Sequence, residues 1–195
     1  MKRFFFRTLG CKVNQYETEA MEELFLRRGY EEAKTEEDCD VYVVNTCTVT
    51  TTSDAKSRQQ INRIKKKNPD AVVAVVGCYS QIAPKVIESM EHVDIILGTK
   101  GRSKIVDMVE SFKENGKRII EVGDVSKNRT FDELFITTEM DMTRAYIKIQ
   151  EGCDMFCTYC IIPYARGHIA SRKLGAIIVE AKTLAQNGFK EIVLT

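Results

Sequence analysis

The stretch AVVAVVGC, residues 71–78, decides the fold of this protein. It is a short apolar run rich in β-branched valine, it follows a turn-forming Asn-Pro-Asp sequence, and it closes on a glycine and a cysteine. A run of this length without polar alternation is typical of a strand buried on both faces in the middle of a parallel sheet. The stretch therefore predicts an α/β protein.

The segments around this strand alternate between strand-like and helix-like patterns. Strands are predicted at residues 4–10, 40–46, 71–77, 93–98 and 117–123, and helices at residues 14–28, 53–67, 83–91 and 101–115. Gly29 marks the end of the first helix. This βαβα order predicts a parallel sheet with helices on both of its faces.

The rhythm is lost after residue 123 and returns about twenty residues later. A strand is predicted at 144–150, a helix at 172–187 and a last strand at 191–195. The predicted domains are an N-terminal α/β domain at 1–123, a linker at 124–142 and the beginning of a second domain at 143–195. Because a single βαβ unit cannot bury its own faces, we expect the chain to be the N-terminal fragment of a longer protein.

Composition limits the classes of protein that remain. The 195 residues are 44% apolar and 29% charged with a net charge of +1, so no global field indicates a nucleic-acid partner. No targeting segment is found and the longest apolar run is too short to span a bilayer, which predicts a cytoplasmic protein without membrane contact. Seven cysteines in a reducing compartment favour metal or cluster ligation over disulfides. The oligomeric state is left open.

Three of the cysteines follow predicted strands. Cys11, Cys47 and Cys78 come after the strands at 4–10, 40–46 and 71–77. Carboxyl ends of parallel strands share one edge of a sheet, where ligands bind in open α/β folds. A lone cysteine is most often a small buried apolar residue, but three in equivalent positions favour a shared cofactor. Cys39 precedes its strand and is assigned no role.

A second cysteine group lies in GCDMFCTYC, residues 152–160. Cys153, Cys157 and Cys160 have the spacing C-x3-C-x2-C. Three thiolates on a four-iron cube leave one iron free to bind a further molecule, as catalytic metal sites do. The alternative is a zinc site completed by His168, with an unusual histidine spacing.

Four motifs together carry a family resemblance. TLGCKVNQYET (8–18), VVNTCTVT (43–50), VVGCYSQ (75–81) and KIQEGCDMFCTYCIIPYARG (148–167) resemble the radical S-adenosylmethionine (SAM) methylthiotransferases. Within that family the chain is most similar to the branch that acts on N6-threonylcarbamoyladenosine at position 37 of tRNA. Three alternatives stay open: the isopentenyladenosine branch, the ribosomal-protein branch, and a non-catalytic iron–sulfur cluster-binding module.

The resemblance implies a site, a fold and a reaction. It implies an auxiliary [4Fe–4S] cluster on Cys11, Cys47 and Cys78, a radical SAM [4Fe–4S] cluster on Cys153, Cys157 and Cys160, and Tyr159 beside the SAM adenine. It also implies that the α/β domain is followed by the beginning of a TIM-type barrel, truncated in this chain.

The implied reaction replaces the C2 hydrogen of the adenine by a methylthio group. SAM cleaved at the second cluster would supply the radical, because that C–H bond has no useful acidity and a cofactor must carry the hard step. The implied partners are tRNA and a reductase or flavodoxin-type electron donor. No acid–base catalytic residue is assigned. Since the glycine-rich SAM contacts of later strands are absent, we expect little turnover from this chain alone.

One helix is strongly basic. Residues 56–67, KSRQQINRIKKK, carry six bases and no acid. Two interpretations stay open: these side chains contact tRNA phosphates, or they form a solvated helix face, which is the commoner role of a charge run.

Overall fold

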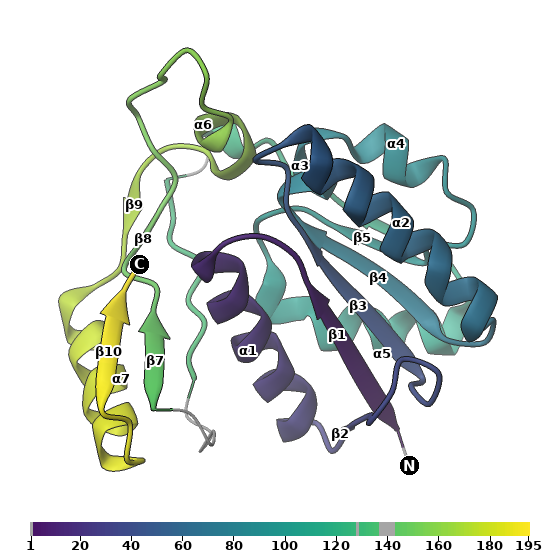
Figure 1. Ribbon diagram of the computed structural model, residues 1–195, viewed down its shortest axis with the longest axis horizontal. Coiled ribbons are helices and arrows are strands. Elements are labelled where there is room, and N and C mark those ends of the chain that lie inside the picture. Colours follow the sequence, from purple (N-terminus) through teal and green to yellow (C-terminus); the bar gives the residue numbers. More distant parts are fainter. Residues whose placement is uncertain (1, 128, 137–142) are drawn as a thin grey trace.

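A six-stranded, all-parallel sheet dominates the computed structural model, which describes residues 2–127, 129–136 and 143–195 (Figure 1). The strand order is β2-β1-β3-β4-β5-β6. The central strands β3 and β4 are buried along their whole length, which confirms the prediction drawn from the valine-rich stretch. The strands are β1 (Arg3–Thr8), β2 (Glu31–Glu32), β3 (Val41–Thr46), β4 (Val72–Gly77), β5 (Ile95–Leu97) and β6 (Ile119–Glu121).

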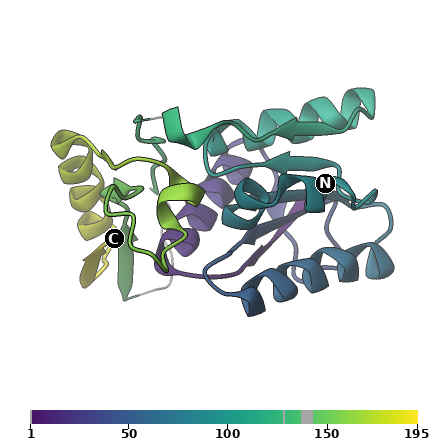
Figure 2. The ribbon, with the colours of Figure 1, turned by 90° about the horizontal axis from the view of Figure 1, so that it is seen from above.

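Helices cover both faces of this sheet (Figure 2). Successive strand residues point to opposite faces, so Val41 and Val43 enter one core while Tyr42 and Val44 enter the other. The first core is closed by α1 (Lys12–Arg27) and α5 (Ile105–Asn115), which is preceded by the 3-10 turn η1 (Arg102–Lys104). The second core is closed by α2 (Thr51–Lys67), α3 (Cys78–Ile82) and α4 (Pro84–Glu88).

The helix predicted at 83–91 is the short helix α4, and a second short helix, α3, precedes it at Cys78–Ile82. Ala83 leaves the helical region, with φ −126° and ψ 52°, and Pro84 begins α4. Proline has no amide hydrogen, which a residue inside a continuous helix needs for its hydrogen bond. In the first turn of a helix the amides have no partner within the helix, so proline is tolerated there. Cys78 is the first residue of α3 and lies at the turn from β4 into that helix.

The second part of the chain is a β–α–β unit. Strand β7 (Arg144–Ile147) pairs in parallel with β10 (Glu191–Leu194), and α7 (Leu174–Gln186) connects them. The strand predicted at 144–150 is broken after Ile147, because Lys148 turns inward to an ion pair with Glu17 of α1. After the break, β8 (Gln150–Glu151) pairs antiparallel with β9 (Ala170–Ser171), and α6 (Ile162–Arg166) lies between them in sequence. A parallel β–α–β unit of this kind occurs both in TIM-type barrels and in doubly wound sheets.

Helix α1 belongs to both parts of the molecule (Figure 1). Its Met21 and Phe25 pack on the sheet, while Tyr16 and Ala20 pack into a third core that contains Ile147 of β7. Leu134, Ile136, Ala145, Leu184 and Phe189 complete that core. The helix is therefore buried on two sides, which explains why even its glutamates Glu17, Glu19 and Glu23 are buried.

The predicted linker, 124–142, is only partly described. It begins with the 3-10 turn η2 (Val125–Lys127), and Leu134 and Ile136 are buried against α1 and β7. Residue 128 and residues 137–142 lie outside the described residues. In the part of the chain that the structure describes, no helix combines the length and the apolar character needed to cross a membrane.

Candidate cysteine sites and the charges between them

The strand register brings three cysteines to one edge of the sheet. Strands β1, β3 and β4 are direct neighbours, and Thr46 is paired with Gly77. Cys47 and Cys78 directly follow these paired residues, and Cys11 lies three residues beyond the end of β1. Cys47 and Cys78 are buried, whereas Cys11 is exposed at the beginning of α1. All three thiols are free of disulfides.

Two glycines allow the loops of this edge to approach one another. Gly10 has φ +112°, and a Cβ atom there would lie only 2.8 Å from the Cys47 sulfur. Gly77 has φ +102°, and a Cβ atom there would lie 2.6 Å from Oδ1 of Asn45. Both backbone conformations disfavour other residues, and both positions lack space for a side chain. The loop that carries Cys11 therefore lies directly on Cys47.

Asn14 fixes the Cys11 and Cys47 loops to each other. Its side-chain amide donates to the carbonyl of Leu9 at 2.7 Å and to the carbonyl of Thr46 at 2.9 Å. These carbonyls lie just before Gly10 and Cys47 in sequence. On its other side, Oδ1 of Asn14 lies 4.0 Å from the Cys11 sulfur. The asparagine thus sets the relative position of two of the three thiols.

Thr46 does the same for the Cys47 and Cys78 loops. Its hydroxyl donates to the carbonyl of Val76 at 2.6 Å and accepts from the backbone amide of Tyr79 at 3.2 Å. The sequence pattern did not assign this role to Asn14 or Thr46. The available signal was their place in the sequence: Asn14 lies three residues after Cys11, and Thr46 directly precedes Cys47.

A pocket of about 560 Å³ adjoins Cys11. Lys12 and Tyr146 form one part of its wall, with the ammonium 5.5 Å from the ring centroid. Glu19 and Glu22 line the pocket too, and burial raises the pKa of both carboxyl groups, that of Glu22 to about 7. The carboxylates of Glu32 and Glu19 reinforce the shift of Glu22.

We expect Glu22→Gln to stabilise the chain in mild alkali and to have little effect in acid. The pKa of Glu22 is about 7 in the folded chain, against an ordinary value of 4.5. The protonated carboxyl group therefore stabilises the fold fully below pH 4.5, and this contribution is lost as the pH rises through about 7. The gain at pH 8 is expected to be about 3 kcal/mol. Urea unfolding at pH 5 and pH 8 measures it, with exposed Glu88→Gln as control. An equal gain at both pH values would contradict the prediction.

The other three cysteines lie in one loop between β8 and α6. The Cys153 amide donates to the carbonyl of Gly167 at 3.1 Å, and the Cys160 amide donates to the carbonyl of Cys157 at 2.9 Å. Cys157 is exposed and Tyr159 is 90% exposed. Phe156, in the middle of the loop, has a positive φ of 48°, which is uncommon for a bulky residue.

The side chain of His168 is paired with a carboxylate. Its Nδ1 is bonded to the carboxylate of Asp154, so a zinc site would have to use Nε2. Within residues 2–127, 129–136 and 143–195, no three His, Cys, Asp or Glu side chains converge as they would around one metal ion. A preformed mononuclear site is therefore not present in the described chain. On a four-iron cube each thiolate binds a different iron, which needs a wider spacing.

The two cysteine sites are joined by α6. This helix packs on α3, which begins with Cys78, and the hydroxyl of Thr99 donates to the carbonyl of Ala165 at 2.7 Å. Arg166 ends the helix and reaches the first site, where its guanidinium donates to Asn14 Oδ1 at 2.7 Å. An arginine from the second cysteine motif thus holds the asparagine that fixes the first.

Arg166 is part of a buried charge cluster, which we define as Glu17, Arg102, Lys148, Glu151 and Arg166. Glu17 accepts from Lys148 and Arg166, each at 2.7 Å, and lies 3.1 Å from Arg102. Glu151 lies 3.3 Å from Lys148 and 3.4 Å from Arg166. Burial opposes ionisation of Glu17, but the three cations hold its pKa well below its usual range. All five side chains are nearly or completely inaccessible to solvent.

The same charges act on the first cysteine site. Burial raises the pKa of the Cys78 thiol, and the guanidinium groups of Arg166 and Arg102 oppose that rise. Cys47 is also close enough to Cys78 to influence it. Sequence reasoning missed this cluster, because its members are spread from residue 17 to residue 166 and meet only in the fold.

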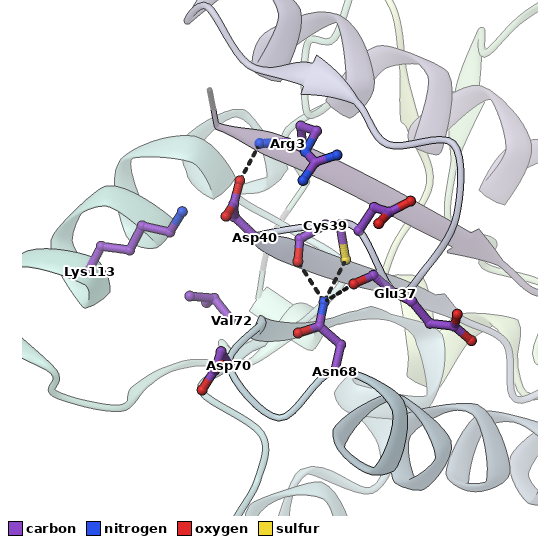
Figure 3. Close-up of a pocket in the computed structure, with 9 residues that line it drawn as sticks. Arg3, Glu37, Cys39, Asp40, Asn68, Asp70, Val72 and Lys113 are labelled. Carbon is purple, nitrogen blue, oxygen red and sulfur yellow. Dashed lines mark hydrogen bonds between the residues drawn. The ribbon is translucent and has the colours of Figure 1, made fainter.

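Cys39 lies at the opposite edge of the sheet, as its place before β3 predicts (Figure 3). It borders a pocket of about 400 Å³ with Asp40 and Asn68, whose amide donates to the Cys39 carbonyl at 2.7 Å. Burial raises the pKa of this thiol to about 11.

The basic run on α2 is largely engaged by the chain itself. Arg63 and Lys67 both pair with Glu36, at 2.8 and 2.9 Å. Lys65 donates to the carbonyl of Ala71 at 2.7 Å, and Arg58 donates to the hydroxyl of Tyr79 at 2.9 Å. Four of the six bases are thus occupied, which favours a structural role for them over phosphate binding.

The fold and the two thiol groups define a class: an α/β domain with a cysteine-lined sheet edge, joined to a three-cysteine loop. Residues 3–98 match the family model described as "Uncharacterized protein family UPF0004". This segment contains all three cysteines of the sheet edge. The six-stranded parallel sheet confirms the α/β prediction for this part of the chain.

Comparison with curated proteins extends the similarity to nearly the whole chain. The chain is 50% identical over 97% of its length to "Threonylcarbamoyladenosine tRNA methylthiotransferase MtaB" of Bacillus subtilis and 40% identical over 97% to that of Aquifex aeolicus. It is 36% identical over 99% to "tRNA-2-methylthio-N(6)-dimethylallyladenosine synthase" of Bacillus cytotoxicus. The resemblance to the methylthiotransferases is confirmed, with higher identity to the threonylcarbamoyladenosine relatives.

The chain spans about two fifths of the length of these relatives. It covers 42%, 46% and 39% of the three proteins, respectively. The matched part contains both cysteine groups and the buried charge cluster.

Proposed function

We propose that this chain is the cluster-binding part of a tRNA methylthiotransferase that converts N6-threonylcarbamoyladenosine at position 37 to its 2-methylthio derivative. The observation that carries the proposal is the sheet edge at which Asn14 and Thr46 tie three cysteine loops together. The 50% identity to a relative named for this activity supports the choice of substrate over isopentenyladenosine or a ribosomal protein.

The residues at both sites fit iron–sulfur clusters. The three thiols at each site are free of disulfides, as iron–sulfur ligation requires. Gly10 leaves the space beside the Cys47 sulfur that a side chain would fill. The guanidinium groups of Arg166 and Arg102 limit the rise that burial causes in the pKa of the Cys78 thiol. In this proposal Cys11, Cys47 and Cys78 hold one [4Fe–4S] cluster and Cys153, Cys157 and Cys160 hold a second, to which SAM binds.

The clusters and SAM, when bound, supply the electron transfer, the radical and the sulfur that the protein's own side chains cannot provide. The chain contributes the positions of the cysteine ligands. Asn14 and Thr46 fix the first trio, and α6 holds the loop of the second against α3. Tyr159, which is exposed beside Cys160, is free to lie against the adenine of SAM. The proposal places the protein in the cytoplasm with tRNA and a flavodoxin-type or reductase electron donor.

Iron content tests the ligand sets. After anaerobic reconstitution with iron and sulfide, we expect about eight irons per chain for the unmodified protein and about four for Cys47→Ser. Cys39→Ser, at the other edge of the sheet, is the matched control and should retain about eight. Equal iron in the Cys47 and unmodified proteins would contradict the assignment, and stoichiometric zinc without iron–sulfur absorption would replace it by the zinc alternative.

The substrate is tested in cells. A strain that lacks the gene should lose 2-methylthio-N6-threonylcarbamoyladenosine from its tRNA nucleosides, as measured by mass spectrometry, and should regain it with the intact gene. Loss of the isopentenyladenosine derivative instead would overturn the substrate assignment. Unchanged tRNA nucleosides in a strain whose protein binds clusters would favour the non-catalytic cluster-binding module.

A further inference from the structure

The buried charge cluster is not electrically balanced. Three bases, Arg102, Lys148 and Arg166, face two carboxylates, Glu17 and Glu151. At the rim, Lys100 and Asp132 add one charge of each sign, through bonds to Glu151 and to the Arg102 backbone. One positive charge therefore remains uncompensated in the protein interior, where burial of an unpaired charge is strongly unfavourable.

The donors of this cluster are not fully used either. In the described residues, Nε and Nη2 of Arg102 have no hydrogen-bond partner although they are buried. Nη2 keeps only the ion pair with Glu17 at 3.1 Å. Buried guanidinium hydrogens normally find acceptors, so these groups indicate an interaction with a negative charge that the side chains do not supply.

The first cysteine site adjoins these cations. Arg166 donates to Oδ1 of Asn14 at 2.7 Å, and the Cys11 sulfur lies 4.0 Å from the same oxygen. Both Arg166 and Arg102 are close enough to act on the Cys78 thiol. Three thiolates carry more negative charge than an oxidised cubane core carries positive charge, so a cluster held there would be an anion.

We infer that the excess positive charge of Arg102, Lys148 and Arg166 is the counter-charge of the cluster on Cys11, Cys47 and Cys78, and that it sets how readily this cluster is reduced. The inference rests on the proposed function. Arg166 is a positioning residue in this scheme, because it acts through Asn14 and through its charge and binds no iron. A nearby positive charge stabilises the more negative, reduced state of the cluster.

Two substitutions of opposite charge test the inference in the full chain with Cys153, Cys157 and Cys160 replaced by alanine, so that only the first site binds iron. Lys148→Met removes the excess charge and should make the cluster harder to reduce. Glu151→Gln doubles the excess and should make it easier. At a fixed potential we expect the ratio of reduced to oxidised cluster to change by about tenfold in each direction. Spectroscopic redox titration with iron analysis measures the ratio.

The control is Arg28→Gln, which removes an exposed ion pair with Asp107 and should leave the potential unchanged. Structural damage alone would shift both variants in one direction or release iron from both. Either result, or unchanged potentials in fully loaded variants, would overturn the inference while leaving the proposed ligands intact. If the background protein itself binds no iron, the proposed ligand set fails, and the inference fails with it.

Discussion

Glu17→Ala is expected to lower the free energy of unfolding of the chain by about 3–5 kcal/mol. The carboxylate is fully buried and lies within 3.1 Å of a nitrogen of Arg102, Lys148 and Arg166. Removing it leaves three cations in the interior with Glu151 as their remaining buried counter-ion. Breaking one side of a buried ion pair is far more damaging than the pair is stabilising, because the other charges stay desolvated. Urea unfolding of the cluster-free chain measures the loss.

The pH dependence separates this effect from simple loss of packing. The pKa of Glu17 is depressed in the folded chain, so its stabilising contribution is present above the ordinary value of 4.5 and is lost as the pH falls below it. The difference in stability between the unmodified chain and Glu17→Gln should therefore be largest near neutral pH and shrink in acid. Glu114→Gln, on the exposed face of α5, is the control. A difference that stays constant between pH 7 and pH 3 would refute the electrostatic explanation.

Gly152→Ala is expected to destroy the second cysteine site while sparing the first. Gly152 has φ +73°, and a Cβ atom there would lie 2.5 Å from the Gly167 carbonyl oxygen and closer still to that of His168. Both are backbone atoms, and the Gly167 oxygen accepts the hydrogen bond of the Cys153 amide, so the loop must be displaced. We expect reconstituted iron to fall from about eight to about four per chain, and stability to fall by at least about 2 kcal/mol.

Two other glycines separate the backbone penalty of a positive φ from the steric clash of the added Cβ atom. Gly29 has φ +81° but nothing within 4 Å of its Cβ position, so Gly29→Ala should show only the backbone penalty of about 1–2 kcal/mol and keep all of its iron. Gly175, in α7, has an ordinary φ and free space, and alanine there should stabilise the helix by about 0.5–1 kcal/mol. Full iron content in Gly152→Ala would show that the tight approach at this residue does not support the cysteine loop.

The sequence predicted the sheet because each signal was local. The valine-rich run at 71–76 and Gly77 after it indicate a central place for β4, and Cys11, Cys47 and Cys78, which follow neighbouring strands, then fall at one edge. The contrast with Cys39 follows from the same reasoning. Short elements were lost, because five-residue helices such as α3 and α6 show no period, and Pro84 was the available signal for a new helix start.

The side-chain contacts between the two sites could not be predicted from local sequence patterns. Lys148 fits the alternation of a strand, and nothing near it in sequence shows that it turns toward a glutamate 131 residues away. Arg166 fits an ordinary helix end, and its contact with Asn14 bridges 152 residues. Partners at such separations depend on how α1, α6 and β7 pack together, which local propensity does not determine.

Helix α1 has a consequence for how this protein can be recombined. One flank of the helix completes the core of the sheet, and Tyr16 and Ala20 on the other flank complete the core that contains Ile147. The two parts are thus joined by a shared helix and not by a flexible linker, and neither part can be exchanged alone. A chimaera that joins this sheet to the second half of a relative must inherit α1 and the strand it packs on from the same parent.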